Sequence, residues 1–188
     1  MNVSNNSRFK ETEKTLKETL LNMILTDNQI ESITVSELSK ASGISRKTFY
    51  CHHSFPSEIL DEIEKETLRD VTIYMSNING NEDKKTLSLI KYIKEKQNVF
   101  KVLLNISNRS FVNQLMKLSF PTFNEIEFHS KQKNIFQYVK SYTLTGTETI
   151  IRDWIHNDCK EEDSTIARLI VQLAKEAIDL SFRFKNVS

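Results

Sequence analysis

Residues that interrupt helices are scarce in this chain. Only three glycines and two prolines occur among its 188 residues, and the long segments between them are rich in leucine, isoleucine, lysine and glutamate. Leucine, lysine and glutamate are good helix formers, whereas a fold of strands and tight turns needs many glycines and prolines. We therefore expect an all-α fold of about nine helices, and a chain of this length can bury a substantial core.

A segment around Gly43 has the pattern of two short helices joined by a turn. Thr34 is a suitable N-cap for the first helix, and Glu37 three residues later completes a capping box. Gly43 stands where that helix should end, because glycine adopts the left-handed conformation without a Cβ clash. Ser45 can cap a second, mainly polar helix over about residues 46–52. This arrangement is a helix-turn-helix, whose second helix enters the major groove of DNA.

The distribution of charge also indicates that this segment contacts DNA. The net charge of the chain is only +1, so affinity for DNA must come from local charge. Lys40, Arg46 and Lys47 lie in the segment, and no acidic residue occurs between Lys40 and His53, whereas residues 58–66 are strongly acidic. This asymmetry would orient the molecule on a phosphate backbone.

Three short motifs in the segment are a Thr-Val start, an Ala-x-Gly-Ile-Ser turn and a Thr-Phe-Tyr-x-His run, at residues 34–35, 41–45 and 48–52. They resemble the tetracycline-repressor (TetR) family of bacterial transcription regulators. Some positions match family residues at or beside backbone phosphates, and these are Thr34, Tyr50 and His52. Others match residues that face base edges, and these are Arg46, Lys47 and Thr48. With the cap of the second helix, the expected DNA-binding set is Thr34, Ser45, Arg46, Lys47, Thr48, Tyr50 and His52.

Two positions depart from the family pattern. His53 stands where the family usually has a core phenylalanine, and Pro56 stands where many members carry a phosphate-contacting lysine. The histidine can pack as a neutral imidazole or turn towards DNA, and we favour packing. The proline removes one expected contact to DNA.

Apolar residues recur at helical spacing along the rest of the chain. The expected helices cover about residues 8–26, 56–78, 84–96, 99–105, 111–118, 134–156 and 162–184, whereas 122–133 is ambiguous. The turn-forming run NGNED at 79–83 separates two of these helices. We expect a DNA-binding domain over residues 1–53 and a ligand-binding and dimerisation domain over 54–188. The helix at about 56–78 would link them.

The last two expected helices each carry an apolar stripe, and Gly146 interrupts the first of them. A glycine inside a helix costs roughly 1 kcal/mol relative to alanine, and the close approach of another helix is the most economical explanation. The segment GTETIIRDWI, which begins at Gly146, resembles the branch of the family that includes dihydroxyacetone-kinase regulators. Because the last two helices of the family form a four-helix dimer interface, we expect a homodimer with interface residues Gly146, Ile150, Leu173, Ala174, Ala177 and Phe184.

The resemblance implies a repressor that a small-molecule effector releases from a double-stranded, palindromic operator. Two recognition helices of a dimer would sit in successive major grooves about 34–36 Å apart. The aromatic residues of the central helices can line an effector cavity or form ordinary core. The candidates for the lining are Phe100, Phe111, Tyr142 and Trp154, which would favour a small apolar or aromatic effector. The alternative is a regulator that acts through a protein partner, as some relatives in the same branch do.

Other functional classes are disfavoured by the sequence. Two distant cysteines, Cys51 and Cys159, give no disulfide framework and are typical of a reducing cytoplasm. His156 and Cys159 lie near acidic residues, but a structural zinc site needs four ligands, so we favour a polar surface loop and expect no metal or cofactor. No nucleophile motif or phosphate-binding glycine loop is present, which argues against an enzyme. The N-terminus is polar and no segment approaches the length of a membrane span, so we expect a cytoplasmic protein without membrane contact.

Overall fold

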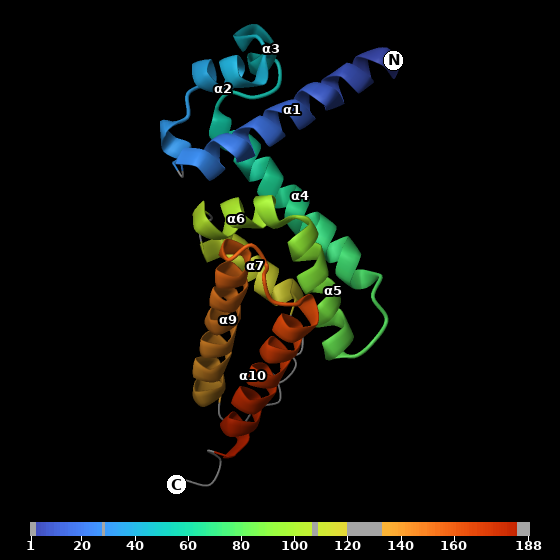
Figure 1. The fold of residues 1–188 in the computed structure, drawn as a ribbon, viewed down its shortest axis with the longest axis vertical. Coiled ribbons are helices and arrows are strands. Elements are labelled where there is room, and N and C mark those ends of the chain that lie inside the picture. The colour runs from blue at the N-terminus through green and yellow to red at the C-terminus, as the bar shows by residue number, and fades with distance from the viewer. Residues whose placement is uncertain (1–2, 28, 107–108, 120–132, 184–188) are drawn as a thin grey trace.

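The computed structural model describes residues 3–27, 29–106, 109–119 and 133–183. These residues form nine α-helices and a short 3-10 helix, without a strand in the described part, and this confirms the expected all-α fold (Figure 1). The helices are α1 (Val3–Asp27), η1 (Ile30–Ser32), α2 (Val35–Ser42), α3 (Arg46–Tyr50), α4 (Pro56–Ser76), α5 (Glu82–Glu95), α6 (Gln97–Ile106), α7 (Arg109–Ser119), α9 (Lys133–His156) and α10 (Asp163–Arg183). The ambiguous stretch 122–133 falls almost entirely outside the described residues.

The observed boundaries differ from the expected ones mainly at helix ends. The first helix begins at Val3 rather than near residue 8, and α3 ends at Tyr50 rather than near residue 52. At the end of α3 the backbone N–H of Cys51 donates to the carbonyl oxygen of Thr48 over 3.1 Å, which tightens the last turn.

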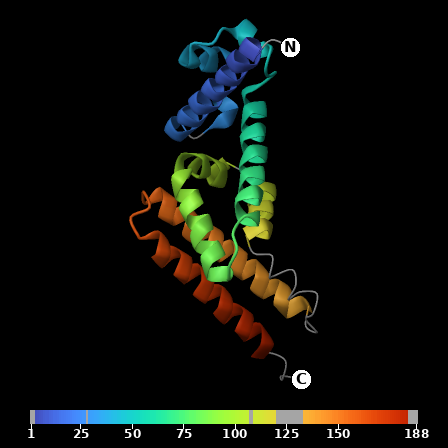
Figure 2. The ribbon, with the colours of Figure 1, turned by 90° about the vertical axis from the view of Figure 1, so that its right-hand side faces the viewer.

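The molecule is elongated, with α1, α2 and α3 at one end and the free ends of α9 and α10 at the other (Figures 1 and 2). Helix α4 runs from the first group along the molecule and packs against α7. Helix α10 packs against both α5 and α9, while α6 contacts α1 on one side and α9 on the other. Because α6 contacts both α1 and α9, it connects the N-terminal helices with the C-terminal ones.

Large apolar side chains fill the interior along the whole length of the molecule. In the N-terminal group, Leu16, Leu20, Leu38 and Phe49 have no exposed surface. Further along the chain, the largest fully buried side chains include Phe100, Phe111 and Phe136. Burial of side chains of this size stabilises the fold by roughly 1.5–3 kcal/mol each.

Helix α4 is fixed against α1 by both charge and apolar contact. It begins at Pro56, a residue suited to the first turn because it has no N–H to leave unpaired. The ammonium group of Lys17 on α1 binds Glu66 over 2.8 Å and Glu62 over 3.3 Å on α4. Burial alone would lower the pKa of Lys17, but the hydrogen bonds and negative charges of the two glutamates outweigh it and raise that pKa.

The turn between α9 and α10 is tied to the rest of the C-terminal helices. The indole Nε1 of Trp154 donates to the carbonyl oxygen of Glu161 over 3.0 Å, and Lys94 of α5 binds Asp163 at the start of α10 over 2.8 Å. Cys159, expected in a polar surface loop, is buried at 7% exposure, and burial raises the pKa of its thiol. No helix among the described residues is long and apolar enough to cross a membrane.

Candidate nucleic-acid interface and effector cavity

The turn between α2 and α3 is built by the capping residues that the sequence indicates. The backbone N–H of Glu37 donates to the hydroxyl of Thr34 over 3.2 Å, and the N–H of Thr34 donates to the carboxylate of Glu37 over 2.9 Å. Gly43 ends α2 at φ 70°, in the left-handed region that favours glycine. Ser45 then caps α3 by accepting the N–H of Thr48 over 3.1 Å. These local bonds fix the angle between the two helices.

Helix α3, which we call the reader helix, presents polar side chains to the outside and buries one aromatic ring. Phe49 has no exposed surface and anchors the helix in the core. Tyr50 is 62% exposed, and Arg46 is also exposed, with its guanidinium donating to the hydroxyl of Ser36 on α2 over 2.6 Å. The remaining expected contact residues that are exposed are Thr34, Ser45, Lys47 and Thr48.

His52 is the expected DNA contact that the structure places differently. Its ring is turned inward, its side chain is only 5% exposed, and it stacks on Phe9 of α1 with ring centroids 4.0 Å apart. Its Nδ1 contacts one carboxylate oxygen of Glu13 on α1. We therefore assign His52 to the support of the reader helix and not to its outer face.

His53 contacts the same carboxylate from the other side. Its Nε2 lies 3.0 Å from the second oxygen of Glu13, and its side chain is 2% exposed, in keeping with the packed position favoured from the sequence. Its Nδ1 lies 3.8 Å from a carboxylate oxygen of Glu62 on α4. We call Glu13, His52 and His53 the histidine clamp, because it joins the end of the reader helix to α1.

Two residues of the histidine clamp, together with Glu62, have some features of a metal site. Glu13, His53 and Glu62 can each place one potential ligand atom within 4.8 Å of the others. However, each ring nitrogen of His53 already faces a carboxylate, Nε2 that of Glu13 and Nδ1 that of Glu62. A closed structural zinc site uses four ligands, whereas three potential ligand atoms gather here among the described residues, so we favour a hydrogen-bonded cluster.

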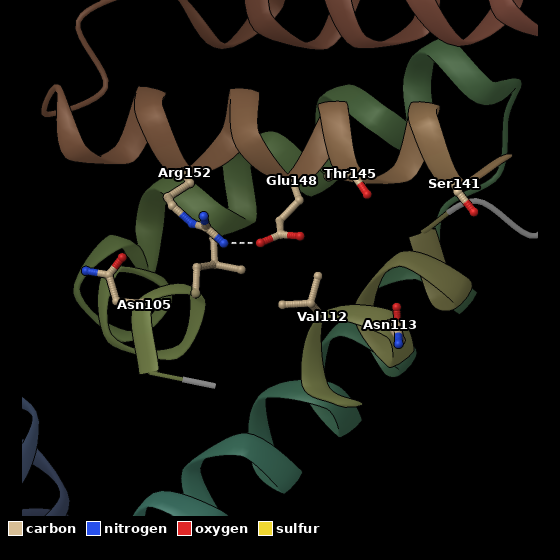
Figure 3. A pocket seen from close by; sticks show the side chains of 8 residues that line it. Asn105, Val112, Asn113, Ser141, Thr145, Glu148 and Arg152 are labelled. Atoms are coloured by element: carbon tan, nitrogen blue, oxygen red, sulfur yellow. Dashed lines mark hydrogen bonds and ion pairs between the residues drawn. The ribbon is translucent and has the colours of Figure 1, made fainter. Parts of the chain in front are cut away.

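A cavity of about 620 Å³ lies between α6, α7 and α9 (Figure 3). Two apolar residues, Leu104 and Val112, contribute to its wall. The other lining residues in the described part of the chain are polar, and they are Asn105, Asn113, Ser141, Thr145, Glu148 and Arg152. Glu148 and Arg152 point into the cavity from adjacent turns of α9 and form an ion pair there. A volume of this size suits a small metabolite.

The aromatic residues expected to line an effector site lie elsewhere. Phe100, Phe111 and Trp154 are each no more than 2% exposed and belong to the packed core, while Tyr142 is 77% exposed on an open groove. The polar lining is not among the residues predicted from the sequence, although part of it has a regular helical spacing. On α9 it forms a second stripe with spacings of four, three and four residues, at Ser141, Thr145, Glu148 and Arg152.

A shallow groove between α9 and α10 contains several of the expected dimer residues. Gly146, Ile150 and Leu173 line it, and Leu173 is 50% exposed. A Cβ atom added at Gly146 would meet no other atom of the chain within 4 Å, so packing within one chain does not require this glycine. Ala174 is buried and Ala177 is half-buried, and the expected Phe184 lies outside the described residues.

The sequence also matches a known regulatory region. Residues 80–176, just over half of the chain, match the family model of the TetR transcriptional regulator C-terminal region. An all-helical chain with this region is a transcriptional regulator. The chain belongs to the TetR family. No curated protein matches it in sequence.

Two solved structures share the fold. The dihydroxyacetone kinase operon activator DhaS superposes with a TM-score of 0.55 at 18% identity, over 90% of this chain and 97% of its own. The fatty acid degradation regulator FadR from Bacillus halodurans gives a TM-score of 0.56 at 15% identity, over 87% of this chain and 94% of its own. The first of these neighbours corresponds to the branch that the sequence resembles.

The histidine clamp makes a testable contribution to stability. Glu13→Ala leaves two buried imidazoles without their carboxylate, so we expect the free energy of unfolding to fall by about 2–3 kcal/mol. The matched control is Glu11→Ala, which removes an exposed carboxylate from the same helix and should change stability by less than about 0.5 kcal/mol. Urea unfolding followed by circular dichroism measures both. Equal stabilities of the two variants would show that the clamp does not hold the reader helix.

Proposed function

We propose that this TetR-family regulator is a homodimeric, DNA-binding repressor of the cytoplasm that a small-molecule effector releases from a palindromic operator. The observation that carries the proposal is the reader helix. It is capped at Ser45, anchored through Phe49, and presents exposed cationic and hydroxyl side chains on a protein whose net charge is only +1. A short helix with this surface fits the major groove, where such groups contact phosphates and base edges. The proposed contacts are Thr34, Ser45, Arg46, Lys47, Thr48 and Tyr50.

In this proposal residues 1–53 bind DNA, residues 54–188 bind the effector and form the dimer, and α4 links the two parts. The cavity favours a small-molecule effector over a protein partner, because it is large enough for a metabolite. Asn105 of α6 lines that cavity, and its Oδ1 lies 3.0 Å from Nε2 of His156 on α9. Helix α6 also packs against α1, which supports the reader helix. An effector that favours one position of α6 would therefore change the position of the reader helix.

The proposed dimer interface is the groove between α9 and α10 together with the apolar side chains beside it. Leu169, Leu173 and Leu180 of α10 are between 41% and 50% exposed and lie on one face of that helix. Exposed apolar residues gathered on one face are typical of an interaction surface. A second copy would bury them and bring two reader helices onto one DNA site.

The reader helix is tested by removing its two cations. Arg46→Ala together with Lys47→Ala should weaken binding to a DNA fragment selected by the parent protein by at least about tenfold. The dependence of binding on salt should also become shallower by up to about two units of log K against log salt, because two phosphate or groove contacts are lost. Fluorescence anisotropy at several salt concentrations measures both quantities.

The control for this experiment has the same change in charge. Lys65→Ala with Arg69→Ala removes two exposed cations from α4, outside the reader helix, and should leave binding within about twofold of the parent. If the two double variants lose affinity equally, only net charge matters and the assignment of the reader helix fails.

The dimer is tested at Gly146. Because a Cβ atom at Gly146 would meet no neighbouring atom within 4 Å, Gly146→Ala should stabilise the helix by up to about 1 kcal/mol, whereas the larger side chain of Gly146→Leu should obstruct a partner helix. We expect Gly146→Leu to weaken the dimer at least tenfold by sedimentation equilibrium and to reduce operator binding in parallel.

The matched control is Gln137→Leu on the same helix. Gln137 is exposed and lies nine residues before Gly146, about half a turn round the helix, so its leucine faces away from the groove. This variant should remain as dimeric as the parent. A monomeric parent, or an undisturbed dimer in Gly146→Leu, rules out this interface.

A further inference from the structure

The chemical groups that line the cavity between α6, α7 and α9 restrict what it can bind. Among the residues that the structure describes, the lining offers a guanidinium, a carboxylate, two amides and two hydroxyls, against two aliphatic side chains. An apolar or aromatic ligand would remove these polar groups from water without offering hydrogen bonds, which costs about 1–3 kcal/mol for each group left unpaired. The cavity therefore suits a ligand with several polar groups.

Arg152 is the group in this lining with the largest unused capacity for hydrogen bonds. A guanidinium has five N–H donors, and one terminal nitrogen of Arg152 donates to Glu148. Its Nε is buried and has no hydrogen-bond partner in the described part of the chain. The side chain as a whole is 37% exposed, so it has room to turn. A carboxylate can accept two parallel N–H bonds from the edge formed by Nε and a terminal nitrogen, and a modest rotation of the side chain would present that edge.

Glu148 and the uncharged polar side chains of the lining determine which groups the ligand should carry besides its carboxylate. The carboxylate of Glu148 is 18% exposed and accepts hydrogen bonds only, so it needs a hydroxyl or ammonium donor when the ligand takes Arg152. Asn105 of α6 and Asn113 of α7 line the same cavity, as Figure 3 shows. Ser141 and Thr145 add hydroxyl groups that both donate and accept.

We infer that the cavity binds a small carboxylic acid that carries hydrogen-bond donors, such as a hydroxy acid or an amino acid. The ligand carboxylate binds Arg152, and a ligand hydroxyl or ammonium group binds Glu148. This inference rests on the proposed function in taking the cavity as the effector site, and it replaces the apolar or aromatic effector expected from the sequence.

The inference is tested by thermal unfolding of the full-length protein with matched ligands. The acid probes are glycerate and gluconate, each paired with its polyol, glycerol or sorbitol, and the amino acids serine and glutamate. At about 100 times its Kd, an acid that binds should raise Tm by roughly 5–10 °C, whereas the polyols should not. The hydroxy-acid and amino-acid arms show which donor Glu148 prefers.

Two substitutions assign the effect to this cavity. Arg152→Gln should weaken binding of the acid by tenfold or more, and Arg69→Gln, an exposed arginine on α4, should not. Glu148→Gln removes a carboxylate that competes for Arg152 and should leave hydroxy-acid binding as tight or tighter, while it weakens amino-acid binding. Circular dichroism checks that each variant folds, and Glu148→Gln gives an independent test if Arg152→Gln does not.

The inference is overturned if none of the acids raises Tm, or if Arg152→Gln retains the full shift. These measurements contain no DNA, so they are separate from the proposed function. An acid that binds through Arg152 but leaves DNA binding unchanged would support the site and contradict release of the operator. If none of the acids binds but the protein still binds DNA, the inference about the cavity fails and the proposed DNA-binding function is not contradicted.

Discussion

The position of the reader helix depends on one carboxylate. Glu13 of α1 faces His52 through one oxygen and His53 through the other, directly after the reader helix ends. The chain could not bury two imidazoles here without a partner for their nitrogens, because each unpaired polar group costs free energy. The capping bonds of Thr34 and Ser45 hold the turn between α2 and α3, and α2 packs directly against α1, while the clamp ties the end of the reader helix to α1. Glu62 beside His53 and the ion pairs of Lys17 extend this support to α4.

Helix α9 contributes to the core, to the cavity and to the proposed dimer interface, because three of its faces have different surroundings. One face carries Phe136 and Trp154 into the core, and a second carries Glu148 and Arg152 into the polar cavity. The third, at Gly146, lines the groove beside α10, where an added Cβ atom would meet no neighbouring atom of the described residues within 4 Å. In the proposed regulator, this helix would couple the cavity to the dimer interface. Through Asn105 and α6 the same cavity lies next to the helix that supports the reader.

The elements predicted correctly from the sequence are those with local signals. A capping box at Thr34, a glycine in the left-handed region at Gly43 and a helical stripe in α9 depend on residues within a few positions of each other. The inward turn of His52 depends on Glu13, 39 residues away, and no local pattern could reveal it. The family motif indicates a residue at or beside a backbone phosphate at this position, whereas in the structure the ring stacks on Phe9 of α1.

The lining of the cavity could not be predicted from the sequence for a different reason. Aromatic residues such as Phe100 and Trp154 were reasonable candidates for a pocket, but large rings gain most from close packing and the fold places them in the core. The lining comes instead from three helices, and only its part on α9 has a regular spacing. Asn105 and Asn113 join it through the packing of α6 and α7, which requires the tertiary structure.

The central claim is that a two-fold pair of reader helices recognises DNA. It is tested most directly by selecting fragments of genomic DNA that the full-length protein binds and sequencing them. The account predicts an inverted repeat whose half-sites are centred about 10–10.5 base pairs apart, or a multiple of this, because two helices of a symmetric dimer enter major grooves on one side of the duplex. Enrichment of a single unrepeated site, or of no sequence at all, would contradict it.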